Sequence, residues 1–106
     1  MANDPYTALS HPVRRGIIEK LAHESTTVGE ATSHFGLSKP TISRHLKVLE
    51  EAGVVRRRVV GRHHHLDLNP AALEVPYAWL SQQRDVWERM FDAVEDHLRA
   101  QQDSER

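Results

Sequence analysis

Three consecutive histidines stand in the stretch GRHHHLDL, at positions 61–68. Histidine is the commonest metal ligand of proteins, and alternate residues of a β-strand share one face. In a strand His63, His65 and Asp67 would lie on the same face, as three candidate ligands for a metal ion. A closed zinc site needs four ligands and an open catalytic site needs three. A metal-binding protein that uses these residues is therefore one hypothesis for the chain.

The sequence offers little to an enzyme. No nucleophile and base form a recognisable pair, there is no cysteine, and 106 residues leave no room for a second domain that would form a cleft. We therefore expect no enzyme and no cofactor. No apolar run approaches the ~20 residues of a membrane span, and MANDPYTALSHPVRR lacks the apolar core of a signal peptide. These features predict a cytoplasmic protein with no membrane partner.

The charge is distributed unevenly along the chain. Residues 1–66 hold 10 Lys+Arg against 6 Asp+Glu, whereas residues 67–106 hold 4 against 9, a difference that the net charge of −1 conceals. The basic excess is greatest at 37–66, with seven basic and two acidic residues. A basic segment joined to an acidic one indicates an anionic partner for the first and a separate role for the second. The alternative is an ordinary surface of interspersed ion pairs.

The stretch SKPTISRHLKVLEEAG, at 38–53, has the pattern of a helix that enters the major groove of DNA. At about 100° per residue, Ile42, Leu46 and Leu49 share an inward arc, and the opposite arc is small and polar near its start and then basic. A helix N-terminus favours phosphate, small hydroxyls fit against bases, and Arg44 can pair with a guanine edge. The expected DNA contacts are Ser38, Lys39, Thr41, Ser43, Arg44, His45 and Lys47, with Arg58 and Arg62 beyond the helix.

Each of these assignments has a purely structural alternative. Ser38 is also a good N-cap, and Arg44 and Lys47 are also ordinary solvated charges. His45 lies at the border of the inward arc and fits a helix-packing histidine, hydrogen-bonded to backbone, equally well.

The remaining helices are indicated by their start signals and apolar periods. Apolar residues recur with a helical period at 13–21, 28–35 and 42–49, and the short turn Gly36-Leu37 joins the second run to the third. Two short helices joined in this way form a helix-turn-helix. The expected N-caps are Asp4, Ser10, Thr27, Ser38 and Asn69, each followed by a proline or, at Thr27, by the Glu30 of a capping box.

A β-hairpin is expected after the third helical run. Val54–Val60 is rich in β-branched residues, Gly61-Arg62 is a turn signal, and His63–Leu68 reads as a second strand. The hairpin would carry Arg58 on its first strand and Arg62 at its tip.

The segment from Pro70 to Leu98 holds both tryptophans and a long apolar stripe. Pro76 interrupts it, so we expect a short helical turn before the proline and one long helix after it. The stripe holds more large apolar surface than so small a domain needs, which favours dimerisation over covering its own core. A module that pairs through this helix with another chain is the alternative. The residues expected in a dimer interface are Tyr77, Leu80, Trp87, Phe91, Val94 and Leu98.

The strings ALSHPVRRGIIEKLA and GLSKPTISRHLKVLEEAGVVRRRVVGRHHHLDL resemble the ArsR-type winged helix-turn-helix repressors, over about 6–98. The resemblance implies a single, mainly α domain at 1–106 with four helices, a small β-hairpin wing and a terminal helix. Its DNA-reading part would span about 11–68 and its dimerisation helix about 70–101. It also implies a homodimer that binds a near-palindromic operator of double-stranded DNA, represses transcription, often of its own gene, and is released by a small-molecule inducer.

The sequence departs from the metal-sensing members of that family. Their cysteine pair on the first helix of the helix-turn-helix has no counterpart in TTVGEATSHF, and of their terminal-helix zinc ligands only His97 has a match. The chain therefore resembles the non-metal branch. On this interpretation the three histidines belong to the wing, where neighbouring phosphate favours protonated imidazole and DNA affinity would depend on pH.

Overall fold

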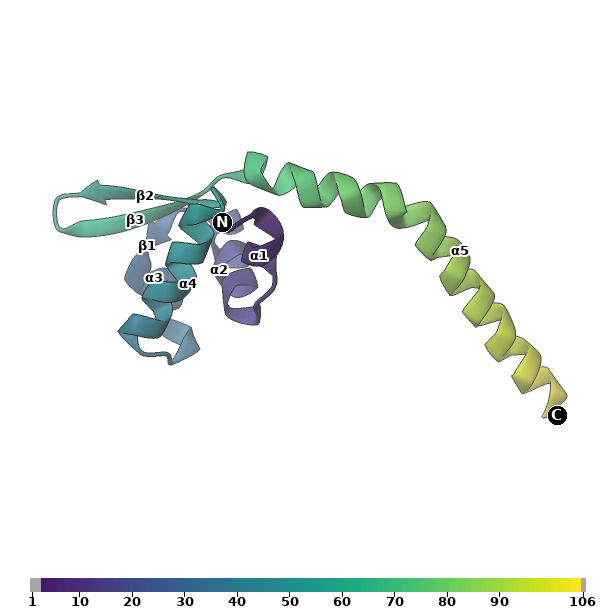
Figure 1. Ribbon diagram of the computed structural model, residues 1–106. Coiled ribbons are helices and arrows are strands. Elements are labelled where there is room, and N and C mark those ends of the chain that lie inside the picture. Colours follow the sequence, from purple (N-terminus) through teal and green to yellow (C-terminus); the bar gives the residue numbers. More distant parts are fainter. Residues whose placement is uncertain (1–2, 106) are drawn as a thin grey trace. The chain divides into compact units, whose positions relative to one another are not determined.

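The computed structural model describes residues 3–105 (Figure 1). They form ten helical and strand elements. The chain divides into two compact units between Pro76 and Tyr77. The elements are α1 (Pro5–Leu9), α2 (Pro12–His23), β1 (Thr26–Thr27), α3 (Val28–Thr32), η1 (Ser33–Phe35), α4 (Lys39–Glu51), β2 (Val55–Val60), β3 (His63–Leu68), η2 (Pro70–Leu73) and α5 (Glu74–Ser104). The predicted winged helix-turn-helix, mainly α with a β-hairpin wing, is confirmed.

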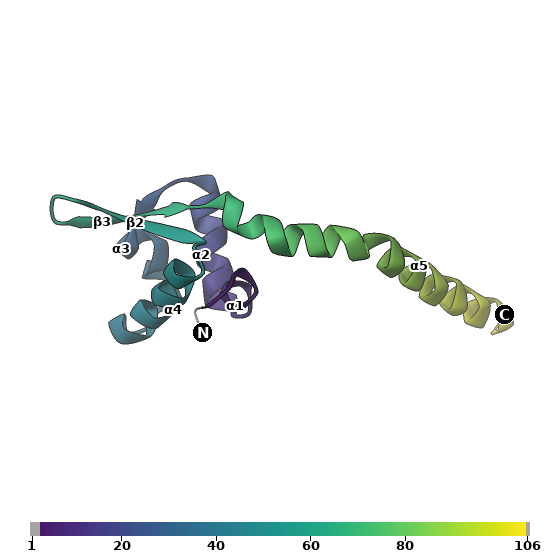
Figure 2. The ribbon, with the colours of Figure 1, turned by 45° about the horizontal axis from the view of Figure 1, so that its top comes forward.

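The sheet has three antiparallel strands in the order β1-β3-β2, one more than the predicted hairpin. In the wing Val55 pairs with Leu68 and Val60 with His63, so the hairpin extends beyond the helices of the first unit (Figure 2). The additional strand β1 pairs Thr26 with Leu66. Two residues are too few to show the alternating pattern by which a strand is recognised in a sequence.

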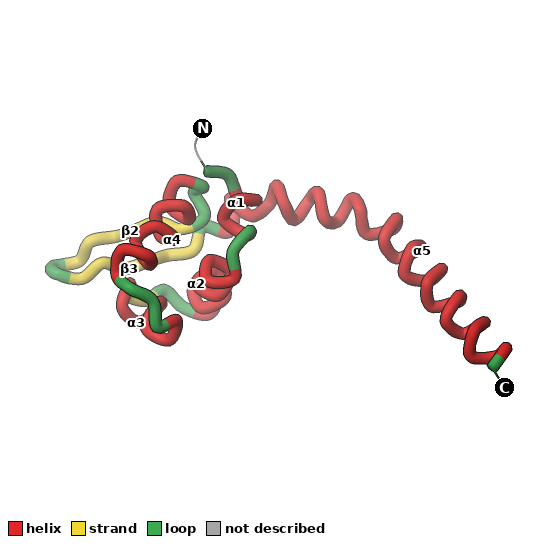
Figure 3. Tube along the Cα trace, turned by 60° about the horizontal axis from the view of Figure 1, so that its bottom comes forward, coloured by secondary structure: helices red, strands yellow, loops and turns green. Residues whose placement is uncertain are grey.

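The core of the first unit lies between the sheet and helices α2, α3 and α4, which follow one another through short loops (Figure 3). The inward arc predicted for α4 is confirmed, since Ile42, Leu46 and Leu49 are all buried. Ile17 of α2 and Leu66 of β3 are fully buried in the same cluster. This packing leaves the other arc of α4 exposed to solvent.

Three predicted N-caps are confirmed. The side chains of Asp4, Thr27 and Ser38 each accept a hydrogen bond from the backbone N–H three residues ahead. The capping box is only half formed, because the Glu30 carboxylate accepts from the Thr26 hydroxyl instead of the Thr27 backbone. Glu30 thereby ties α3 to the buried threonine of β1.

One predicted N-cap is wrong, and another holds its position without a side-chain capping bond. His11, not Ser10, caps α2, and its Nδ1 accepts from the Val13 N–H at 3.1 Å. Ser10 ends α1 instead, where its hydroxyl donates to the Thr7 carbonyl. Asn69 does occupy the N-cap position of η2, ahead of Pro70, but its side chain makes no capping bond. Its amide instead donates to the Gly53 carbonyl at 2.9 Å, which joins the wing to the end of α4.

The start of the long helix differs slightly from the prediction. A helical turn, η2, does precede Pro76, but α5 begins at Glu74, before the proline. The N–H groups of a first helical turn have no partner within the helix, so a proline there removes no hydrogen bond. Within residues 3–105 no helix is long and apolar enough to cross a membrane.

Two helical glycines should respond oppositely to alanine. A Cβ at Gly16 would lie 2.7 Å from Cζ of Phe35, whereas one at Gly29 would meet no heavy atom within 4 Å. Alanine at Gly29 should raise the free energy of unfolding by about 0.5 kcal/mol, because it restricts the unfolded chain. Alanine at Gly16 should lower the free energy of unfolding by about 1 kcal/mol, because displacing the Phe35 ring destabilises the fold by more than the higher helix propensity of alanine stabilises it. Urea denaturation of both variants measures the difference, and equal gains would contradict the contact.

Candidate nucleic-acid interface

The N-terminus of α4 presents a small polar surface. The Ser38 hydroxyl accepts from the Thr41 N–H at 3.3 Å and lies 2.9 Å from the Thr41 hydroxyl. Both predicted DNA contacts therefore also hold the helix start, and Lys39 and Ser43 next to them are exposed. A capped helix N-terminus with exposed hydroxyls and a lysine is suited to receive a phosphate.

Two cations follow on the outward arc of the same helix. Arg44 is exposed and forms no ion pair with any other residue of the described part of the chain. Lys47 lies 3.9 Å from Glu51, with 76% and 38% of the two side chains exposed. Exposed ion pairs of this kind contribute little to the free energy of folding, so Lys47 can readily exchange Glu51 for another anion. The positive charge of this arc is thus largely uncompensated within the first unit.

His45 faces the body of the domain rather than the outward arc. Its Nδ1 lies 3.0 Å from Nη1 of Arg14, and its ring centroid lies 4.4 Å from that of His11. Arg14 also donates to the backbone carbonyls of Thr7 and Ala8, which holds the guanidinium between α1 and α4. These contacts favour the packing role for His45 over a DNA contact, with an arginine as its partner instead of backbone.

The contact between His45 and Arg14 is expected to make the stability of the domain depend on pH. Arginine is only a donor, so Nδ1 of His45 must be unprotonated to accept from Arg14. Burial lowers the pKa of His45 below its usual 6.5, and the charges of His11 and Arg14 lower it further. At pH below 6.5 the unfolded chain binds a proton that the folded chain resists, so stability falls as pH falls toward the folded pKa.

Thermal denaturation should therefore show that Tm decreases as the pH is lowered from about 7.5 to about 5. His45→Gln should flatten this dependence, because it removes the group whose pKa differs between the folded and unfolded chains. His23→Gln, at an exposed position at the end of α2, should leave the dependence intact. Identical profiles for the wild type and both variants would show that His45 does not contribute.

One face of the wing carries an ion pair. Nε of Arg58 lies 2.6 Å from Oδ2 of Asp67, and the Ser25 hydroxyl donates to the other carboxylate oxygen. These hydrogen bonds, Arg58 first and then Ser25, lower the pKa of Asp67. Arg58 remains more than half exposed, so it could add a phosphate contact while it stays paired.

The same contacts bear on the metal hypothesis. The pairing of Arg58 with His65 and of Val60 with His63 places both histidines on the Asp67 face, as expected. Asp67 is nevertheless committed to an arginine and a serine. Over residues 3–105 no group of three histidine, aspartate or glutamate side chains is arranged to hold a metal ion.

The opposite face of the wing connects to α4 through a residue that the sequence analysis did not select. Nε of Arg57 lies 2.6 Å from Oε1 of Glu50, and its Nη1 lies 3.3 Å from Nδ1 of His64. Arg62 is exposed at the tip, after Gly61 with φ of +62°. No sequence signal marks the pair of Arg57 and Glu50, because it depends on how a strand leaves a helix.

The second unit presents the apolar stripe as a largely exposed surface. Phe91 is 70% exposed and Tyr77 is 68% exposed, and Leu80, Val94 and Leu98 are exposed as well. Trp87 is half-buried and packs edge-on against Trp79, with 5.9 Å between ring centroids. Apart from Trp79, these residues are the six predicted for a dimer interface.

Comparison with known proteins agrees with this architecture. A family model described as a helix-turn-helix domain matches residues 9–58. The transcriptional repressor SdpR of Bacillus subtilis is 35% identical over 78 residues, which cover 74% of this chain and 87% of SdpR. The crystal structure of an ArsR family transcriptional regulator superimposes with a TM-score of 0.70 at 29% identity, over 78% of this chain and 91% of the other.

A third relative is the transcriptional repressor BigR of Xylella fastidiosa, whose crystal structure matches with a TM-score of 0.58 at 32% identity, over 72% of this chain and 79% of BigR. All three relatives are regulators of transcription, not enzymes. Helix α4 is the second helix of this helix-turn-helix, the element that such proteins place in the major groove of DNA. The chain belongs to the ArsR family of winged helix-turn-helix proteins and is a DNA-binding transcriptional repressor.

Proposed function

We propose that the protein acts as a homodimer on a near-palindromic operator, with α4 in the major groove and the wing along the backbone. The DNA-reading part would comprise about 11–68 and the dimerisation helix about 70–101. The observation that carries the proposal is the exposed arc of α4, whose opposite side is packed into the core. On this arc Arg44 has no ion pair within residues 3–105, and Lys47 has only the exposed pair with Glu51 at 3.9 Å. A small-molecule signal would release the dimer from DNA.

The proposed contacts divide by chemistry. Arg44 and Ser43 lie where a helix in the groove meets base edges, and Lys39, Lys47 and Arg62 are cations suited to phosphate. Further contacts are proposed for Ser38, Thr41 and Arg58, which also have roles within the domain, and for His45 if it leaves Arg14.

The homodimer rests on the apolar stripe of α5. Exposed apolar patches of this extent are uncommon on monomers and mark interaction sites. A two-fold dimer also matches two half-sites of a palindrome, since the symmetry of the protein then equals that of the operator.

The test is fluorescence anisotropy of EDTA-treated protein with its own upstream DNA, against a scrambled duplex of equal length. We expect preferential binding that weakens steeply with salt, as about 6–10 phosphate contacts per dimer require. Binding that appears only when zinc is restored would support the metal hypothesis for His63 and His65 instead. A heterodimer in cell extract, with no homodimer and no DNA preference, would support the protein-interaction module.

A further inference from the structure

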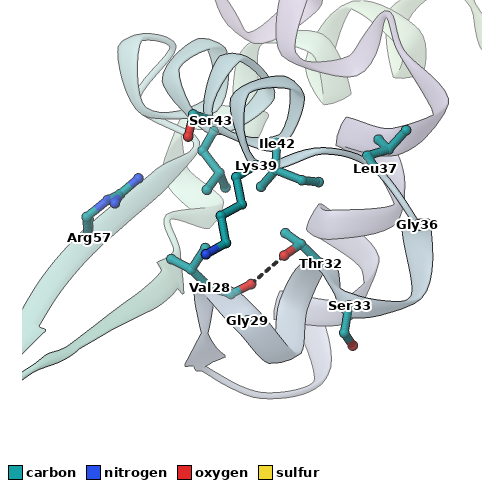
Figure 4. Close-up of a pocket in the computed structure, with 11 residues that line it drawn as sticks. Val28, Gly29, Thr32, Ser33, Gly36, Leu37, Lys39, Ile42, Ser43 and Arg57 are labelled. Carbon is teal, nitrogen blue, oxygen red and sulfur yellow. Dashed lines mark hydrogen bonds between the residues drawn. The ribbon is translucent and has the colours of Figure 1, made fainter.

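A pocket opens within the helix-turn-helix itself, between α3, η1 and α4, with Arg57 of the wing at one side (Figure 4). Its volume is about 430 Å³. Pockets that hold small organic ligands have volumes of about 300–1,000 Å³. The pocket lies wholly in the first unit and is separate from the apolar stripe of α5.

The lining is apolar within and cationic at the rim. Val28, Ile42 and Leu46 supply branched apolar side chains. The Thr32 hydroxyl donates to the Val28 carbonyl at 2.7 Å, so its proton does not require a hydrogen-bond acceptor on a ligand. Figure 4 shows the Lys39 side chain extending across the space toward Val28.

The charge of the rim is not balanced by the lining. Lys39 and Arg57 are its ionisable residues, and no aspartate or glutamate lines the pocket over residues 3–105. Arg57 is paired with Glu50, but Lys39 has no ion pair within that part of the chain. An ammonium group over an apolar floor favours a ligand that is apolar at one end and anionic at the other.

We propose that this pocket binds a small amphipathic anion, a compact apolar body with one carboxylate. The apolar body lies against Val28, Ile42 and Leu46, and the carboxylate pairs with Lys39. A DNA phosphate could pair with Lys39, but it would make no favourable contact with the apolar lining of the pocket.

The position of the pocket gives the ligand a role, which rests on the proposed DNA contacts. Lys39 and Ser43 line the pocket and are also exposed residues of α4 among the proposed DNA contacts. A bound carboxylate and a DNA phosphate compete for the same ammonium group, so the ligand weakens DNA binding. By linkage, DNA weakens binding of the ligand by the same factor.

The first experiment titrates the full chain with naphthalene-2-carboxylate and records ¹H–¹⁵N correlation spectra. We expect the amide signals of Gly29, Gly36 and Ser43 to shift, because these residues line the pocket. The neutral 2-naphthalenemethanol should bind about tenfold more weakly, since it lacks the charged hydrogen bond. Shifts confined to 77–104, or equal affinity for the acid and the alcohol, would overturn the proposal.

Two variants and a control localise the site. Lys39→Gln should lower the affinity for the carboxylate about tenfold and leave the affinity for the alcohol unchanged, because only the carboxylate pairs with the ammonium group of Lys39. Gly29→Phe should abolish binding of both ligands, because Gly29 lines the pocket and a Cβ there meets no heavy atom within 4 Å, which leaves room for a ring that competes with the ligand. Lys20→Gln removes a lysine that does not line the pocket and has no proposed DNA contact, so it should leave the affinity for both ligands unchanged. Unchanged affinity in Lys39→Gln would overturn the assignment of the carboxylate.

A competition assay separates this inference from the proposed function. Wild-type protein is first bound to its upstream DNA without ligand, and naphthalene-2-carboxylate is then added. If the protein prefers its upstream DNA and the carboxylate reverses this binding, both the proposed function and the coupling between ligand and DNA are supported. Preferential binding that saturating carboxylate leaves unchanged overturns the coupling alone. No DNA preference at the start overturns the operator assignment, and the spectra still decide whether the pocket binds the anion.

Discussion

Arg44→Ala should lower the affinity for operator DNA by about tenfold to a hundredfold at fixed salt, because a bidentate contact to guanine contributes about 1–3 kcal/mol of discrimination. The side chain is exposed on α4 and has no ion pair within residues 3–105, so its removal should leave the stability of the domain unchanged. Fluorescence anisotropy with operator and scrambled duplexes measures the ratio of the two affinities, and that ratio should shrink.

Arg99→Ala is the matched control for this prediction. Arg99 is an equally charged, exposed arginine on α5, paired with Glu95 at 2.9 Å. Its loss should change operator affinity by no more than about twofold, as expected for a charge remote from phosphate. Equal losses in the two variants would show that net charge, rather than the recognition helix, determines binding. A uniform loss on both duplexes in Arg44→Ala would reassign Arg44 to a phosphate contact.

Phe91→Asp should convert the proposed homodimer to a monomer. The ring is 70% exposed in the single chain, so a dimer that covers it buries two copies by symmetry. Losing about 1.5–3 kcal/mol for each copy should raise the dissociation constant of the dimer by about 10²–10⁴. Sedimentation velocity across a range of protein concentrations measures the change. The affinity for operator DNA should also fall, because a monomer contacts only one half-site of the operator whereas a dimer contacts both.

Ala93→Asp provides the control for the dimer. Position 93 is exposed and lies about 200° around the helix from Phe91, so the same acid is introduced on the opposite face. This variant should remain dimeric. If Phe91→Asp instead lowers Tm and leaves the mass unchanged, the stripe covers the protein's own core. If the wild type is a monomer at all concentrations, the interface proposal is wrong.

Much of the fold was predictable because its signals are local. The helical period at Ile42, Leu46 and Leu49 identified the inward side of α4, and the pairing of Arg58 with His65 follows from the turn at Gly61. The N-caps were less predictable. Ser10 and His11 both precede Pro12 within a turn, and the competing bond from Ser10 to Thr7 decides between them only after α1 has formed.

The sequence by itself determined the main helices, the two strands of the hairpin, the inward face of α4 and its exposed basic arc, because periodicity, capping and turn chemistry act over a few residues. Only the tertiary structure decided which polar groups remain available. Arg14 engages His45 across 31 positions, and Arg57 meets Glu50 where the wing leaves α4. The third strand and the pocket between α3 and α4 likewise arise from segments brought together by packing. Such contacts depend on the relative placement of whole elements, which no short sequence pattern encodes.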